Sequence, residues 1–176
     1  SGRGVGTDVV RQGIEALKGS IEIRAQPGEG SRFLMRVPLT MAITDAMIVR
    51  VGDQRYIIPT IKIKQSVRPA PGEIATVQGE AEMLRFMNEM IPVVRLHEIF
   101  RLEPQYQDLG EGILVVVEET TGRYALFIDE LLGQAQVVAK TLGEAFGKVP
   151  GISSGAILGD GRVGLILDTA ELKVAA

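Results

Sequence analysis

Three glycines at the start of the chain are the residues whose type and spacing most directly suggest chemistry. Gly2, Gly4 and Gly6 alternate with other residues and precede a run with helical spacing. Glycines let the backbone approach a phosphate closely, and the amides at a helix N-terminus attract anions. A dinucleotide-binding site would need a preceding strand and a βαβ unit, whereas a helix and a hairpin are expected here. The glycines therefore predict at most one wall of a phosphate site, with a plain flexible linker as the alternative.

The rest of the sequence offers little for catalysis or metal binding. The chain has no Cys and one His, which excludes thiol nucleophiles, disulfides, Cys-based zinc sites and a histidine cluster. His97 follows an apolar strand and is expected to be a structural or surface residue. Solvation or turn hydrogen bonds explain the carboxylates at strand ends and turns, which are Glu118, Glu119, Asp129, Glu130 and Asp160. We predict no catalytic residue and no metal site.

Composition restricts the class of protein. The 176 residues include 19 Lys plus Arg and 22 Asp plus Glu, for a net charge of −3, and 45% are hydrophobic, which is typical of a globular protein. No apolar run approaches the roughly 18 residues that span a bilayer, so direct membrane insertion is not expected. Without a block of Lys or Arg, no nucleic-acid partner is expected. Because the chain begins SGRGVG, without Met or a signal peptide, we expect a fragment of a longer polypeptide.

Residues 1–38 form the first predicted domain. Apolar residues spaced by about 3.6 positions predict an amphipathic helix from Thr7 to Leu17, which Gly19 would end. The runs SIEIRA and SRFLMRVPL flank a Pro-Gly turn and predict a β-hairpin. One helix and one hairpin cannot enclose a hydrophobic core by themselves.

From about Leu39, short strands separated by turn signals predict a β-sandwich or barrel. A half-buried strand is predicted at residues 61–67, with polar connections at 70–81 and 103–112. Asp168 would cap a last helix, because Glu171 follows at capping-box spacing. Hairpins are predicted at residues 46–58, 83–96, 112–129 and 156–167.

The second half of this region repeats the first. An Arg-Tyr pair opens the return strand of the first hairpin at Arg55-Tyr56 and that of the third at Arg123-Tyr124. The second and fourth hairpins each lead into a short helical segment. This weak self-similarity predicts two related small β-barrels, the alternative being a coincidence of common hairpin patterns.

Chemotaxis histidine kinases end their ATP-binding domain with a segment that resembles SGRGVGTDVVRQGIEALKGSIEIRAQPGEGSRFLMRVPLT. In that family Gly2, Gly4 and Gly6 match the second glycine box, which contacts the nucleotide phosphates. The runs MAITDAMIVRVGDQRYIIP, MIPVVRL, RYALFIDELLGQAQVV and KVPGISSGAILGDGRVGLILD resemble the CheW-like regulatory domain of the CheA kinases. The resemblance covers essentially the whole chain. It implies a mainly β protein in which residues 1–38 are the tail of a GHKL-type ATP-binding domain and residues 39–176 form a CheW-like pair of small SH3-like β-barrels.

The resemblance also implies a function. It predicts a regulatory coupling module that binds the CheW adaptor and the cytoplasmic tip of a chemoreceptor, at membrane receptor arrays, in a parent kinase that is a homodimer. The phosphoacceptor His domain, magnesium helix and adenine box of such kinases have no counterpart in the 176 residues. We therefore expect no enzyme activity and no cofactor in this chain, whereas the parent would use ATP and Mg. The alternatives are a free-standing CheW-type adaptor, disfavoured by the segment ahead of the first barrel strand, and an ATP-using kinase fragment.

Apolar positions near strand ends are the candidates for partner contacts. A turn is predicted at Gly133-Gln134, between two apolar runs, and it should leave some side chains at a barrel end. A loop is predicted around Ile152. Core packing is the alternative for each candidate. The five candidates are Leu131, Leu132, Val137, Val138 and Ile152.

Overall fold

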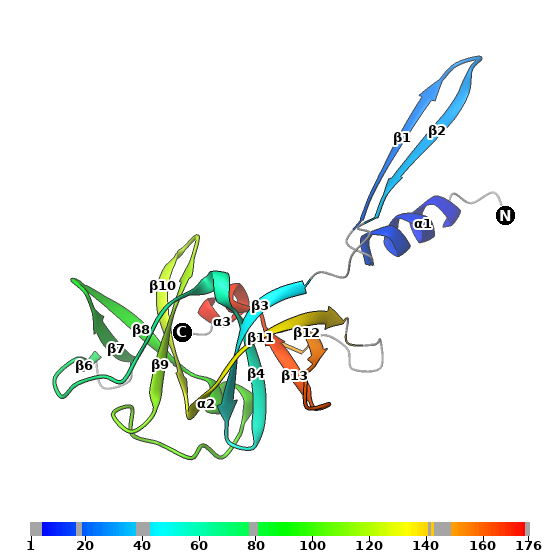
Figure 1. Cartoon of the computed structure of the whole chain (residues 1–176). Coiled ribbons are helices and arrows are strands. Elements are labelled where there is room, and N and C mark those ends of the chain that lie inside the picture. The colour runs from blue at the N-terminus through cyan, green and yellow to red at the C-terminus, as the bar shows by residue number, and fades with distance from the viewer. Residues whose placement is uncertain are drawn as a thin grey trace. The chain divides into compact units, whose positions relative to one another are not determined.

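The chain divides into two compact units, Ser1–Met41 and Ala42–Ala176. Figure 1 shows the computed structural model, which describes residues 5–16, 19–37, 43–77, 81–140, 142 and 149–174. The described part of the first unit holds one helix and one hairpin, and the second unit holds the remaining strands and short helices.

The first unit has the helix and hairpin that its sequence predicts. Helix α1 spans Val5–Ala16, and strands β1 (Ser20–Gln26) and β2 (Gly30–Arg36) pair antiparallel. Gly28 and Gly30 in the connecting turn have φ of +82° and +104°, a conformation that residues with a Cβ rarely adopt. Apolar side chains on both the helix and the hairpin remain exposed within this unit, as expected of elements that cannot enclose a core alone.

The second unit contains all four predicted hairpins. They are formed by β3 (Ile43–Val51) with β4 (Gln54–Pro59), β7 (Ala81–Phe86) with β8 (Glu89–Arg95), β9 (Ile113–Glu119) with β10 (Gly122–Ile128), and β12 (Ile152–Ile157) with β13 (Val163–Leu167). The other elements are the 3-10 turn η1 (Thr60–Lys62), β5 (Ile63–Val67), β6 (Ile74–Val77), α2 (Leu96–Phe100), β11 (Glu130–Lys140) and α3 (Thr169–Val174).

These strands form two sheets, so the mainly β architecture is confirmed. One sheet closes into a five-stranded barrel in the order β11-β12-β13-β4-β3. The other has six strands in the order β5-β9-β10-β8-β7-β6. Each sheet contains one parallel contact, between β13 and β4 in the barrel and between β10 and β8 in the six-stranded sheet.

The two halves of the sequence exchange hairpins between the sheets. Hairpin β3–β4 from the first half joins β11, β12 and β13 in the barrel, whereas hairpin β9–β10 from the second half joins β5 to β8. In Figure 1 the cyan strands of the first hairpin accordingly lie beside the orange strands from the end of the chain. The sequence repeat does not indicate this exchange, because a hairpin has the same local sequence pattern whichever of the two sheets it joins.

The two Arg-Tyr pairs of the repeat occupy matching places. Tyr56 stacks on Phe100 of α2 with ring centroids 4.7 Å apart, and the Tyr124 hydroxyl donates to the Thr169 carbonyl at the start of α3 over 2.7 Å. Each tyrosine therefore joins the first hairpin of its half to the short helix that ends that half.

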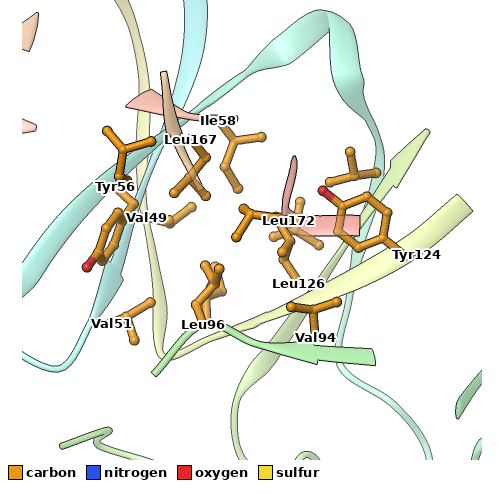
Figure 2. Packing of buried hydrophobic residues seen from close by; sticks show 14 residues of the cluster. Val49, Val51, Tyr56, Ile58, Val94, Leu96, Tyr124, Leu126, Leu167 and Leu172 are labelled. Atoms are coloured by element: carbon orange, nitrogen blue, oxygen red, sulfur yellow. The ribbon is translucent and has the colours of Figure 1, made fainter. Parts of the chain in front are cut away.

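The largest cluster of buried side chains joins the two sheets. Figure 2 shows that Val49 and Ile58 from the barrel point toward Val94 and Leu126 from the six-stranded sheet, with Leu172 of α3 packed between them. Burial of aliphatic side chains is the main favourable term in folding. Because both sheets contribute to this cluster, they share one core and stabilise each other.

The segment from residue 60 to 81 departs from the sequence-based prediction in two ways. The expected strand at 61–67 begins only at Ile63, because Thr60–Lys62 form η1 and a register shift between Ile63 and Gln65 breaks the alternation. The polar connection at 70–81 contains β6, which pairs with β7. Four residues between turn signals are too short for periodicity to distinguish a strand from a loop.

The turn predicted at Gly133-Gln134 is wrong. Strand β11 continues from Glu130 to Lys140, and the pairing with β3 shifts by one residue between Leu131 and Gly133. Gly133 has a φ of +139° and accommodates a β-bulge instead of a turn. The loop predicted around Ile152 is also wrong at that residue, because β12 begins there.

Candidate partner-binding surface

The three glycines expected to contact phosphates fall mostly outside the described residues. Gly2 and Gly4 lie outside them, and Gly6 lies in the first turn of α1, where no neighbouring atom stands within 4 Å of the position of a Cβ. Their contact with a nucleotide stays a prediction. Within the described ranges, no group of three or more His, Asp or Glu side chains is placed to hold a metal ion.

The five apolar candidates for partner contacts differ in burial. Val137 and Ile152 are only 2% and 6% exposed and belong to the hydrophobic core, so a partner cannot reach them in this fold. Leu131 and Val138 are half-buried. Leu132 is 39% exposed, because it is the extra residue of the bulge opposite β3. Of the five, Leu132 therefore presents the most accessible side chain.

Sequence reasoning missed the most exposed large hydrophobic residue of the second unit. Ile61 in η1 is 89% exposed, although strand alternation would have turned it toward the core. Other exposed apolar residues flank hairpin turns, and the only available signal was their proximity to those turns. They are Met87 in the β7–β8 turn, Met90 near the start of β8, and Ile157 and Val163, which pair across β12 and β13.

An ion pair between the partly exposed Lys62 and a buried carboxylate lies directly beside Ile61. The Lys62 ammonium is 2.9 Å from the Glu119 carboxylate, whose other oxygen accepts a 2.5 Å hydrogen bond from the Thr169 hydroxyl. The Glu119 side chain is only 5% exposed. Burial raises the pKa of Glu119, but the hydrogen bonds from Thr169 and Lys62 together outweigh it and hold the pKa below its usual value.

A second buried carboxylate, Asp129, connects segments of both sheets. It accepts backbone hydrogen bonds from Gly52 at 2.6 Å, Gln105 at 3.1 Å and Tyr106 at 3.3 Å. Gly52 lies in the β3–β4 turn, and the other two lie in the connection before β9. Asp129 therefore fixes two loops, which is a structural role.

His97, the one histidine, is packed inside the second unit. Its ring lies edge-on to Phe127 at 6.1 Å between centroids, and its Nδ1 is buried without a hydrogen-bond partner among the described residues. Burial lowers the pKa of His97, and the positive charge of Arg95 lowers it further. The folded protein therefore favours the neutral imidazole.

We expect the stability of this unit to fall as pH decreases from about 7 to about 5. The unfolded state binds a proton at the ordinary His pKa of 6.5, whereas the folded state resists protonation, so acid favours unfolding. In the variant His97→Phe, the free energy of unfolding, measured by urea unfolding at several pH values, should no longer fall from about pH 7 to about pH 5. An unchanged slope in the variant would contradict the assignment to His97.

The family of this chain is identified by comparison with known proteins. Residues 45–175 match the model of the CheW-like domain family, so the chain belongs to that family. It is 39% identical over 174 residues to the chemotaxis protein CheA of Klebsiella aerogenes, covering 99% of this chain and 27% of that protein. It is also 39% identical over 173 residues to CheA of Salmonella typhimurium, covering 98% of this chain and 26% of that protein. The chain thus spans about a quarter of the length of these relatives.

A solved structure supports the fold independently. The crystal structure of the scaffolding protein TtCheW from Thermoanaerobacter tengcongensis matches with a TM-score of 0.57 at 12% identity, covering 72% of this chain and 89% of that one. The resemblance to CheA kinases found in the sequence is confirmed by the curated relatives. Residues 45–175 form a non-catalytic, CheW-like coupling domain of chemotaxis proteins. No helix in the described residues is long and apolar enough to cross a membrane.

Proposed function

We propose that this chain is the regulatory coupling module of a chemotaxis histidine kinase and that it binds the CheW adaptor and the cytoplasmic tip of a chemoreceptor. The match of residues 45–175 to the CheW-like family is the observation that carries this proposal. The module would act in the cytoplasm, at receptor arrays in the membrane. Residues 1–38 would be the tail of the kinase ATP-binding domain, and ATP and Mg would be bound by the homodimeric parent.

The exposed apolar residues on the second unit support binding of a protein partner. Ile61 and Leu132 both lie where the chain leaves regular strand geometry, at η1 and at the β11 bulge. The buried centre of a protein interface is more apolar than its rim, so an exposed aliphatic side chain that a partner covers can contribute to affinity. A standard interface of roughly 1,600 Å² would require several such residues.

We expect Ile61→Glu and Leu132→Glu to keep the fold and to weaken binding of the CheW adaptor or of a receptor-tip fragment. A charge at a desolvated contact should cost about 2 kcal/mol of binding free energy. Both side chains are accessible, so the thermal unfolding midpoint should change little.

Calorimetric titration of the whole 176-residue chain would measure these affinities. Val9→Glu is a matched control, because Val9 is an exposed aliphatic residue in the first unit, outside the CheW-like domain. Binding that survives both Ile61→Glu and Leu132→Glu would mean that the partner surface lies elsewhere.

A further inference from the structure

The turn η1 exposes Ile61 and lies between Pro59, which pairs with β3, and Ile63, which pairs with β9. The Thr60 hydroxyl is buried and has no hydrogen-bond partner in the described part of the chain. Among those same residues, the contact of Lys62 with Glu119 is the one side-chain hydrogen bond or ion pair that η1 makes. This contact therefore ties the turn to β9 through a side chain.

Glu119 draws Lys62 toward the interior. A buried carboxylate without a partner is strongly destabilising, and the Thr169 hydroxyl supplies only a neutral hydrogen bond. The Lys62 ammonium, at 2.9 Å, supplies the charged hydrogen bond that stabilises the carboxylate, and the more distant charge of Lys173 adds to it. In a 3-10 turn, successive side chains point about 120° apart. Because the Lys62 side chain reaches toward Glu119 on one side of the turn, the side chain of its neighbour Ile61 points toward solvent.

We propose that Glu119 is a positioning residue of the partner-binding surface, because with Lys62 and Thr169 it fixes η1 between the two sheets and α3 and so presents Ile61 to the partner. This inference rests on the proposed function. The Glu119 side chain on β9 is only 5% exposed and so does not touch the partner. Its role in binding is indirect, through the position of Ile61.

The neighbouring strand positions provide a matched comparison. Next to the pair that joins Lys62 of η1 to Glu119 of β9, Lys64 of β5 and Glu118 of β9 form an ion pair at 2.8 Å. Their side chains are 48% and 40% exposed, however, so the pair is solvated and contributes little to the geometry. Glu118→Gln therefore changes the same chemistry without releasing η1.

The test compares the affinity of the whole chain for the CheW adaptor in four variants: Glu119→Gln, Glu118→Gln, Ile61→Ser, and Glu119→Gln combined with Ile61→Ser. We expect Glu119→Gln to weaken binding about tenfold and Glu118→Gln less than about twofold. The double variant should bind no more weakly than Ile61→Ser alone, because Glu119 acts through Ile61. If the fold-losses in affinity of the two single variants instead multiply in the double variant, Glu119 acts independently of Ile61, and the proposal is wrong.

Lys62 supplies a second route to the same answer if Glu119→Gln does not fold. Lys62→Arg retains the ion pair and should retain the affinity, whereas Lys62→Gln should lose it to the extent expected for Glu119→Gln. Normal affinity in Lys62→Gln together with weak binding in Ile61→Ser would overturn the positioning role and leave the proposed function intact. An unmodified chain that does not bind the adaptor at all would overturn the proposed function, and this inference with it.

Discussion

Replacing Val137→Glu is expected to unfold the CheW-like domain. Val137 is 2% exposed and packs against Ala46, Ile57 and Ile166 inside the barrel. A carboxylate at this position would lose its hydration without gaining a partner, which costs several kcal/mol. This loss is comparable with the whole stability of a small domain, so chemical denaturation should show little folded protein at ambient temperature.

Leu132→Glu is the matched control for this prediction. It makes the same change on the same strand, but at the exposed bulge, and should leave the denaturation midpoint nearly unchanged. Sequence analysis first placed both residues among the candidates for partner contacts. If Val137→Glu remained folded and lost adaptor binding, Val137 would be an interface residue and its assignment to the core would be wrong.

Asp129→Ala is expected to lower the free energy of unfolding by about 3 kcal/mol or more, because three backbone N–H groups lose their acceptor. The segments around Gly52 and Gln105 would separate from the start of β11. Asp129→Asn should have a smaller effect, since its amide oxygen can replace Oδ2, which accepts the two shorter bonds.

Urea unfolding would measure both changes, with Asp160→Ala as the comparison. Asp160 is an exposed turn carboxylate that pairs with Arg55, and its removal should change the free energy of unfolding little. A loss in Asp129→Ala no larger than that in Asp160→Ala would show that the loops are held by other contacts.

The hairpins could be predicted from the sequence because their signals are local. The turn at Gly52-Asp53 separates two apolar runs, and Gly52 adopts a φ of +59° that favours glycine. Its position is also fixed by packing, since a Cβ on Gly52 would stand 2.6 Å from the Glu103 carbonyl oxygen. The cap of the last helix was equally local, and the Asp168 carboxylate accepts from the Glu171 amide at 3.0 Å.

The exchange of hairpins between the sheets could not be predicted in this way. It depends on parallel contacts such as Tyr56 with Leu165 and Ala125 with Val93, which join residues far apart in the chain. The repeat predicted two related small β-barrels; the structure has one closed barrel and one six-stranded sheet, and the repeat did not indicate which strands each contains. Asp129 likewise follows an apolar strand in the sequence, and only the folded chain brings Gly52 and Tyr106 to its carboxylate.

The sequence by itself determined the fold class, the repeat and the family resemblance, because these follow from turn residues, alternation and shared motifs along the chain. The tertiary structure alone decided which apolar residues a partner can reach. A single extra residue in β11 exposes Leu132 while Val137 on the same strand is buried. A 3-10 turn likewise exposes Ile61 where alternation predicts burial. Burial depends on contacts with distant strands, and a shift of one residue reverses the face to which a side chain points.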